Sequence, residues 1–163
     1  MIGPIRILSV QFPSVCVRLD GKGVTKPTGP GGGVVNAQYV NQPGPAGFPW
    51  EQFKVHPQAG GSVAFESVTF PNVFIRMDGT GVTKFSGPGA GVVNAQFTAG
   101  PWEKFFVRYQ ANCQAALESA AFPGVFLRLD GTGVSQPSGP GGGKVNCQFG
   151  AGPWEKFYLI AVV

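Results

Sequence analysis

The sequence predicts an all-β fold made of three internal repeats, and two observations support this prediction. One pattern occurs three times along the chain: Phe-Pro, Arg-x-Asp-Gly, a glycine-rich turn, Val-Asn-x-Gln and finally Pro-Trp-Glu. Within each copy, apolar residues alternate with a period of two, as in a half-buried strand. Val73, Ile75 and Met77 fall on one strand face, and Arg76 and Asp78 fall on the other. No apolar stripe of helical period extends over three turns, so strands dominate the prediction.

The elements of one copy follow in a fixed order. After Phe-Pro comes a strand that ends at an Asp-Gly dipeptide, which favours a turn. A glycine-rich turn and the Val-Asn-x-Gln strand come next, and the two strands should pair as a hairpin. Pro-Trp-Glu then leads into a strand through Phe53, Phe105 or Phe157, which alternation assigns to the core. With about four strands per copy, we expect about twelve in all.

The number of copies decides how the sheet closes. Repeats that cannot bury their own apolar face must stack or close on one another. Three copies are fewer than a propeller needs, and the chain lacks the short regular rung of a β-helix. We therefore predict a β-trefoil with pseudo-threefold symmetry, in which a six-stranded barrel is capped by three hairpins. It forms a single domain, 1–163, with repeats of approximately 5–60, 61–111 and 112–163.

Composition excludes several classes of function. The net charge is +4, but the twelve Lys and Arg residues are spread along the chain, which argues against a nucleic-acid partner. The longest apolar runs are too short to span a membrane. A single histidine and no clustered thiols leave no transition-metal site, and no cofactor is expected. The N-terminal stretch also lacks the pattern of a signal peptide.

The three cysteines show no disulfide framework. Cys16 aligns with Phe74 and Phe126 of the other copies, and Cys147 aligns with Ala37 and Ala95. Cys113 has no cysteine counterpart. We expect all three to behave as small buried apolar residues.

Six of the eight acidic residues stand at equivalent positions of the three copies. Three are the aspartates of the Asp-Gly turns, where the carboxylate should accept bonds from nearby backbone N–H groups. The other three are the glutamates of Pro-Trp-Glu. These six residues are Asp20, Asp78, Asp130, Glu51, Glu103 and Glu155.

The predicted hairpins gather arginine, asparagine and glutamine on one polar face. Such a face could hydrogen-bond sugar hydroxyls, or it could stabilise the hairpin itself. Amide side chains are not favoured in strands, so the presence of Asn-x-Gln in all three copies indicates a specific role. The residues that we consider as secondary sugar contacts are Arg18, Asn36, Gln38, Arg76, Asn94, Gln96, Arg128, Asn146 and Gln148.

Pro-Trp-Glu is the strongest candidate for a binding site. In a regular strand, alternation would turn each tryptophan outward and each glutamate toward the barrel mouth. The preceding proline suggests a turn instead, in which ring and carboxylate can point to one place. An indole beside a carboxylate suits a pyranose. The indole can pack against the C–H groups of the sugar, and the carboxylate can accept hydrogen bonds from its hydroxyls. The alternative is structural, with Trp packed on the barrel rim and Glu bonded to turn amides.

Catalysis has little support in the sequence. The only histidine is not repeated, so no nucleophile–base pair emerges. The carboxylates occur once per copy, which would place a glycosidase pair across two repeats and beyond the usual separation. The glycine-rich turns follow turns and open no helix, so they do not form phosphate loops. We expect a protein that is not an enzyme.

Together these motifs resemble the family 92 carbohydrate-binding modules. The resemblance rests on Phe-Pro-x-Val-Phe-Leu-Arg-Leu-Asp-Gly, Gly-Pro-Gly-Gly-Gly, Val-Asn-x-Gln-Phe and Gly-Pro-Trp-Glu-Lys-Phe, and it covers nearly the whole chain. It implies a β-trefoil without catalytic activity, which binds β-1,3- and β-1,6-linked glucans through one Trp/Glu site per repeat. The matching positions are Trp50/Glu51, Trp102/Glu103 and Trp154/Glu155. Copy one departs from the pattern, with six more residues before its tryptophan and "GFPWEQ" in place of "AGPWEK".

The resemblance also sets expectations about partners. It implies a polysaccharide partner, secretion as part of a larger polysaccharide-degrading enzyme of bacterial origin, and a monomeric module with avidity for a polymer. Some members of the family are linked to sulfated algal galactans, which the positive charge would suit. A fainter similarity to fascin-like trefoils implies a second alternative, in which the motif serves packing and the protein binds actin.

Overall fold

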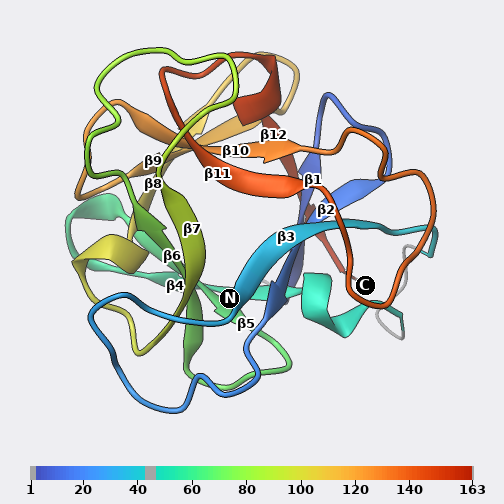
Figure 1. Cartoon of the computed structure of the whole chain (residues 1–163), viewed down its shortest axis with the longest axis horizontal. Coiled ribbons are helices and arrows are strands. Elements are labelled where there is room, and N and C mark those ends of the chain that lie inside the picture. Colours follow the sequence, from blue (N-terminus) through green and yellow to red (C-terminus); the bar gives the residue numbers. More distant parts are fainter. Residues whose placement is uncertain (1–2, 43–46, 163) are drawn as a thin grey trace.

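The computed structural model describes residues 3–42 and 47–162. The described part of the chain forms twelve strands in one antiparallel sheet system, arranged as three lobes about a central axis (Figure 1). No helix among these residues is long and apolar enough to cross a membrane. The strands are β1 (Ile5–Ser9), β2 (Val15–Asp20), β3 (Val34–Tyr39), β4 (Phe53–Pro57), β5 (Val63–Ser67), β6 (Val73–Asp78), β7 (Val92–Phe97), β8 (Phe105–Tyr109), β9 (Ala115–Ser119), β10 (Val125–Asp130), β11 (Lys144–Phe149) and β12 (Phe157–Ala161).

Six of the strands close into a barrel. Each is hydrogen-bonded to two neighbours in the cyclic order β1, β4, β5, β8, β9, β12 and back to β1. The pairing of β1 with β12 joins the two ends of the chain, with Ile7 opposite Leu159. Closure leaves no free edge in the barrel. The sequence prediction of a six-stranded barrel is therefore confirmed.

The other six strands form three hairpins, each of which caps one third of the barrel. In β2–β3 the register sets Arg18 opposite Asn36, and the other two hairpins repeat it. The strands β3, β7 and β11 meet around the central axis (Figure 1). There, single backbone bridges link each hairpin to the next, for example Ala37 to Gly142. The whole arrangement is the predicted β-trefoil.

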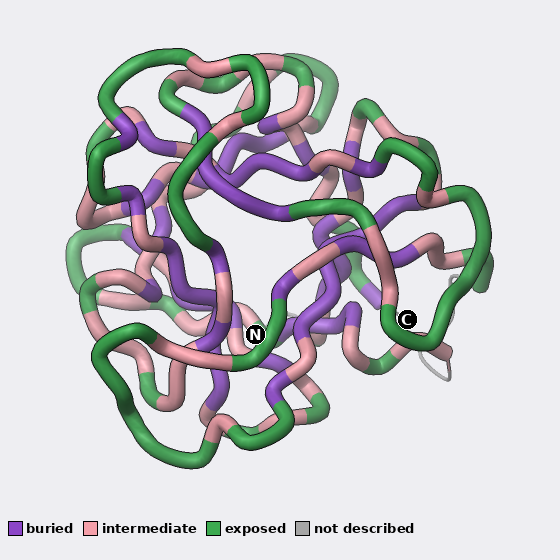
Figure 2. Tube along the Cα trace, viewed as in Figure 1, coloured by how far each residue is buried: buried purple, intermediate pink, exposed green. Residues whose placement is uncertain are grey.

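Three repeat-related phenylalanines form the centre of the core. Phe53, Phe105 and Phe157 are at most 1% exposed, which confirms their predicted place. Full burial of one such side chain stabilises the fold by roughly 2–3 kcal/mol. Buried segments run through the middle of all three lobes, and the exposed segments are the outer loops and the starts of β3, β7 and β11 (Figure 2). Ile75 and Leu127 extend this core into the hairpins.

The cysteines follow the prediction in two cases out of three. Cys16 and Cys147 are buried and free, and burial raises the pKa of each thiol to about 12. Cys113 is free but exposed, so the expectation of a buried residue was wrong for it. It lies in the turn between β8 and β9, with a left-handed backbone (φ 63°). A turn of this kind faces solvent whatever side chain it carries.

Candidate functional site

Each Pro-Trp-Glu forms a short 3-10 turn before a barrel strand. The turns are η1 (Pro49–Glu51), η3 (Pro101–Glu103) and η4 (Pro153–Glu155), and each begins at its proline, whose fixed φ suits that position. The strand alternation considered above therefore does not apply to Trp and Glu, and the turn interpretation is correct. Every tryptophan is half-buried, and every glutamate is at most 4% exposed.

Each tryptophan packs between two repeats. The indole of Trp50 lies over the Arg18 guanidinium, with 4.9 Å between the guanidinium carbon and the ring centroid. Trp102 and Trp154 repeat this contact with Arg76 and Arg128, at 4.9 and 4.8 Å. Such cation–π pairs are stabilising when the cation is desolvated, and these arginines are buried.

A phenylalanine from the following repeat closes the other edge of each indole. These contacts join Trp50 to Phe70, Trp102 to Phe122 and Trp154 to Phe12, with ring centroids 5.2–5.3 Å apart. The phenylalanines are those of the Phe-Pro dipeptides. The tryptophans thus contribute to the packing of the trefoil as well as to its surface.

The glutamates of copies two and three close their own turns. Glu103 Oε1 accepts a hydrogen bond from the Gly100 N–H at 2.7 Å, and Glu155 Oε1 accepts one from Gly152 at 2.8 Å. Glu155 Oε2 also lies 4.0 Å from Arg128 Nε. Burial raises the pKa of both carboxyls, and the glycine N–H groups and arginines act against this shift.

Copy one differs at the same point. Phe48 replaces the glycine and adopts a left-handed backbone (φ 53°). Among the described residues, Glu51 accepts no bond from the N–H of residue 48, and it instead faces Arg18 Nε at 3.8 Å. Burial raises the pKa of Glu51 to about 7, with Arg18 and Arg6 opposing the shift. The departure seen in the sequence therefore changes the acid–base behaviour of one copy.

The polar hairpin residues clamp the glycine-rich loop of a neighbouring repeat. Arg18 Nη1 donates to Asn36 Oδ1 at 3.2 Å, and Arg18 Nη2 donates to the Gly139 carbonyl at 3.2 Å. Asn36 Nδ2 donates to the Pro140 carbonyl at 3.0 Å. Gln38 accepts from the Ser138 N–H at 3.0 Å and donates to the carbonyl of the same residue. One hairpin thus fixes three consecutive residues of another repeat.

The clamp recurs around the axis. Arg76, Asn94 and Gln96 hold the loop 28–30, and Arg128, Asn146 and Gln148 hold the loop 86–88. Of the two roles considered for these residues, the structure provides the stabilising one. The aspartates act as predicted in their turns, since Asp20, Asp78 and Asp130 each accept the N–H two residues on, at 3.0–3.1 Å.

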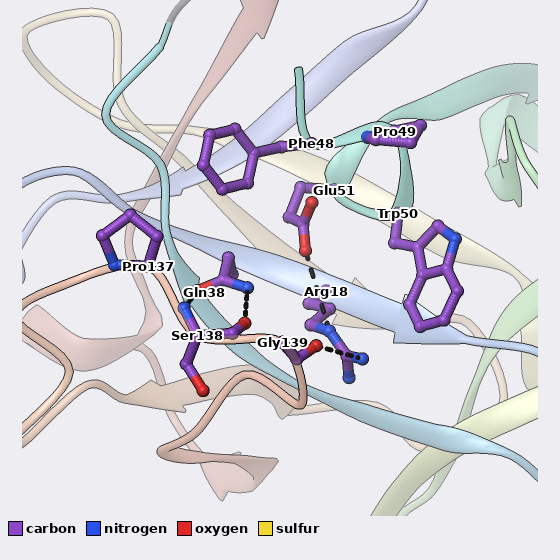
Figure 3. Close-up of a pocket in the computed structure, with 9 residues that line it drawn as sticks. All are labelled: Arg18, Gln38, Phe48, Pro49, Trp50, Glu51, Pro137, Ser138 and Gly139. Carbon is purple, nitrogen blue, oxygen red and sulfur yellow. Dashed lines mark hydrogen bonds and ion pairs between the residues drawn. The ribbon is translucent and has the colours of Figure 1, made fainter.

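Turn, hairpin and neighbouring loop together enclose a cleft in each third of the molecule. Cleft 1, of about 460 Å³, is lined by Trp50, Glu51, Arg18 and Gln38 of one repeat and by Pro137, Ser138 and Gly139 of another. In Figure 3, Glu51 and Arg18 lie between Trp50 on one side and Phe48 with Pro137 on the other.

The other two clefts have the same construction. Cleft 2, of about 390 Å³, is lined by Trp102, Glu103, Arg76 and Gln96 with Pro27 and Gly29. Cleft 3, of about 190 Å³, is lined by Trp154, Glu155, Arg128 and Gln148 with Phe85 and Gly87. The structure therefore brings Trp and Glu of each repeat to one concave surface.

The sequence did not indicate the loop residues that line the far side of each cleft. Position 27, 85 or 137 belongs to a glycine-rich loop, which is distant in sequence from the tryptophan that it faces. The Asn-x-Gln pair was the sign of these contacts. Amide groups in a strand need hydrogen-bond partners, and those that their own hairpin does not supply must come from another segment.

The three clefts present the same set of chemical groups. Each cleft is lined by an indole, one carboxylate and backbone polar groups of the loop. The residue beside each carboxylate is an arginine and not a second acid. Among the described residues, no three His, Cys, Asp or Glu side chains come together to hold a metal ion.

Comparison with known proteins identifies the fold. No family model matches the chain, and no curated protein matches it. ThreeFoil, a designed protein of threefold symmetry, matches with a TM-score of 0.71 at 10% identity, over 98% of this chain and 99% of its own. SeviL, solved bound to the asialo-GM1 saccharide, matches with a TM-score of 0.63 at 8% identity, over 100% of both chains.

A mosquitocidal holotoxin also matches, with a TM-score of 0.73 at 11% identity. The match covers 100% of this chain and only 18% of the holotoxin chain, so this fold is one part of that protein. At identities this low, the similarity establishes architecture alone. The chain is a β-trefoil.

Proposed function

We propose that this protein is a carbohydrate-binding module without catalytic activity, which binds β-glucans through three clefts at once. One observation carries the proposal. The chain has only three tryptophans and few acids, and it uses one Trp and one Glu of every repeat to line the same kind of cleft three times. Turn closure occupies Oε1 of Glu103 and Glu155, and all three carboxylates still line a cleft beside a tryptophan.

The chemistry of each cleft suits a pyranose ring. Each indole is held in place by the arginine over its ring and by a phenylalanine of the next repeat, so little entropy remains to be lost on binding. C–H groups of a sugar can pack on the accessible part of that ring, and the glutamate can accept a hydrogen bond from a sugar hydroxyl. Loop carbonyls and glutamine add further polar groups at the rim (Figure 3).

The specificity for β-1,3- and β-1,6-linked glucans rests on the resemblance to family 92 modules. The resemblance also supports a role outside the cell, next to a polysaccharide-degrading catalytic domain. The trefoil neighbour SeviL is bound to a saccharide in its structure, which supports a sugar ligand for this architecture. Each cleft is small and open, and three weak sites on one polymer give avidity.

The test blocks the clefts without removing the packed tryptophans. Gly29, Gly87 and Gly139 each line one cleft, have no left-handed φ, and leave open space where a Cβ would stand. We expect the triple Gly→Gln variant to fold normally and to lose retardation in gels that contain β-1,3- or β-1,6-glucan. Gly3 has the same open surroundings away from the clefts, so Gly3→Gln is the matched control.

Three outcomes would contradict or redirect the proposal. Full retardation of the folded triple variant would contradict binding in the clefts. Binding only to sulfated galactans, with a steep loss in salt, would replace the neutral glucan by an anionic polymer. Cosedimentation with actin, together with no retardation by any glycan, would favour the fascin-like alternative.

A further inference from the structure

Glu51 differs from its two counterparts in the use of one carboxylate oxygen. In copies two and three, Oε1 of the glutamate accepts the N–H of Gly100 or Gly152. Within the described ranges 3–42 and 47–162, no other residue donates a hydrogen bond to the Glu51 carboxyl, which is buried and lines cleft 1. Its Oε2 faces Arg18 Nε at 3.8 Å, which is beyond hydrogen-bond distance (Figure 3). Oε1 of Glu51 is therefore left for a ligand.

The residue at position 48 accounts for this difference. At Gly100 or Gly152, a Cβ would stand 3.2 Å from Oε1 of the glutamate, which is closer than side chains normally approach. Copy one carries Phe48 there, and its backbone is left-handed (φ 53°) where the two glycines are extended. The bond that closes the turn in the other copies is consequently not made to Glu51.

Arg6 holds this turn in place of the carboxylate. Arg6 Nη1 donates to the Phe48 carbonyl at 3.0 Å, and Arg6 Nη2 donates to the Gly47 carbonyl at 2.9 Å. The equivalent residues of the other copies are Ala64 and Ala116, which can make no such bonds. Copy one thus fixes its turn from strand β1 and does not need Glu51 for that purpose.

The charged groups around Glu51 come from several elements. Arg18 of β2 and Arg6 of β1 favour the ionised carboxylate, and Lys22 Nζ lies over the adjacent indole. The Cys16 thiol is neutral, because burial raises its pKa to about 12. The loop across the cleft supplies no titratable group. Burial outweighs the two arginines and raises the pKa of Glu51 to about 7.

We propose that cleft 1 is a pH-dependent sugar site, which binds glucan through the ionised Glu51 and loses affinity when Glu51 takes up a proton. This inference rests on the proposed function. A sugar hydroxyl can donate to Oε1, and a hydrogen bond to a carboxylate is stronger than one to a neutral acid. The ligand would thus supply the donor that a glycine N–H supplies in the other copies. In clefts 2 and 3 that bond exists without ligand, and it opposes protonation.

The direction of the effect follows from linkage between the sugar and the proton. Because the sugar prefers the ionised form, affinity at cleft 1 should be highest above pH 7 and should fall as pH falls through 7. Between about pH 8 and 5.5, we expect its Kd to rise about five- to tenfold, the difference between a charged and a neutral hydrogen bond. A polymer would then be held less firmly in acid, because one of three sites is weakened.

The three indole N–H signals allow each cleft to be followed separately. They are assigned in a ¹⁵N-correlated NMR spectrum with single Trp→Phe variants, and the protein is titrated with β-1,3-linked glucotriose between about pH 5.5 and 8. We expect the Kd at Trp50 to rise as pH falls, and the Kd at Trp102 and Trp154 to change less. Saturating glucotriose should in turn lower the pKa of Glu51, measured by the ¹³C shift of its carboxyl, because the linkage is reciprocal.

Two variants assign the titrating group. Glu51→Gln keeps the shape of the side chain but cannot ionise, so the Kd at Trp50 should no longer depend on pH. It should stay near the value that the wild type has in acid. His56→Gln is the control, because histidine commonly titrates in this range and the chain has one, bonded to Glu66. This variant should keep the pH dependence at Trp50.

The outcomes separate this inference from the proposed function. If all three indoles respond to glucotriose, but the wild-type Kd at Trp50 varies with pH no more than that at Trp102, the role of Glu51 is refuted and the glucan sites stand. Loss of the pH dependence in His56→Gln would also refute it. If no indole responds at any pH, the proposed function itself fails.

Discussion

At the scale of single residues, each tryptophan serves the fold and the cleft together. The Trp102 indole covers the buried Arg76 and packs on Phe122 of the next repeat. A purely functional ring would contact neither. Because each tryptophan is half-buried, part of its ring packs in the fold and part remains accessible in the cleft.

This double role makes the effect of a truncation predictable. Trp102→Ala should abolish sugar binding at cleft 2 and lower the free energy of unfolding by about 2 kcal/mol, less than for a fully buried Trp. The protein should remain folded, because the barrel core does not include the indole. Guanidinium denaturation measures the loss. Trp102→Phe, which keeps a ring over Arg76, should recover most of the stability, and an unchanged stability in Trp102→Ala would contradict the packing role.

Glu51 should make the stability of the protein depend on pH. Because burial raises the pKa of Glu51 to about 7 in the folded state, its contribution is fully present below the unfolded value near 4.5. That contribution is lost as pH rises through 7. Between about pH 5 and 8, the melting temperature of the wild type should therefore fall by several degrees relative to Glu51→Gln.

Asp78→Asn provides the control for this titration. Hydrogen bonds from the Thr80 side chain and backbone lower the pKa of Asp78, so its contribution changes only below the usual range for aspartate. The variant should keep the wild-type slope between about pH 5 and 8. If Glu51→Gln also kept that slope, Glu51 would not be the titrating group.

The sequence predicted the local turns and caps of these residues, but not their contacts with other parts of the fold. The proline before Trp indicated the turn, and the Asp-Gly dipeptides indicated the caps of Asp20, Asp78 and Asp130. The burial of Arg18 could not be predicted, because it depends on Trp50 and on the Gly139 carbonyl of another repeat. Alternation within one strand carries no information about either contact.

At the scale of elements, the long hairpin loops form the far wall of each cleft. The loop 28–30 is held to the next repeat by Gln96, which bonds both the N–H and the carbonyl of Thr28. The loop has no regular structure of its own, so these bonds determine where it lies. Each cleft thus depends on a contact between repeats.

Removing this clamp should affect stability and binding together. Gln96→Ala removes two hydrogen bonds to the backbone of Thr28 and should cost about 1 kcal/mol in the free energy of unfolding, because solvent can replace part of these exposed bonds. Binding at cleft 2 should weaken as the loop loses its position, while clefts 1 and 3 keep theirs. The control is Gln110→Ala, whose side chain bonds only within its own turn. Equal effects of the two variants on cleft 2 would refute the clamp.

The strands were predictable and the clamps were not, for one physical reason. Strands follow from local alternation and turn chemistry, which each copy contains in full. The clamps join residues 41 to 121 positions apart, such as Arg128 to Gly87 and Arg18 to Gly139. Only the threefold closure of the chain brings those positions together.

At the scale of the whole molecule, the threefold symmetry builds the same kind of cleft three times. The clefts recur around the axis because each is built from two adjacent repeats. Cleft 1 joins the first repeat to the third, which the pairing of β1 with β12 brings together. The sequence predicted closure from the number of copies. The unequal volumes of the clefts could not be foreseen, because they depend on how two loops approach each other.

Three sites on one module should favour a polymer over a short ligand. Blocking cleft 3 with Gly87→Gln should weaken binding to insoluble β-1,3-glucan by about tenfold or more, yet leave the glucotriose Kd of clefts 1 and 2 unchanged. Sedimentation with the polymer and NMR titration with the trisaccharide measure the two effects. Both should persist between about 50 and 500 mM salt, since the ligand is neutral. Loss of binding in salt would indicate an anionic ligand.

The most direct test of the central claim is a crystal structure of the protein with β-1,3-linked glucotriose. We predict a glucosyl ring against the tryptophan of each cleft, with a sugar hydroxyl within hydrogen-bond distance of Glu51, Glu103 or Glu155. Sugar bound elsewhere on the trefoil, with all three Trp/Glu clefts empty at saturating ligand, would contradict it.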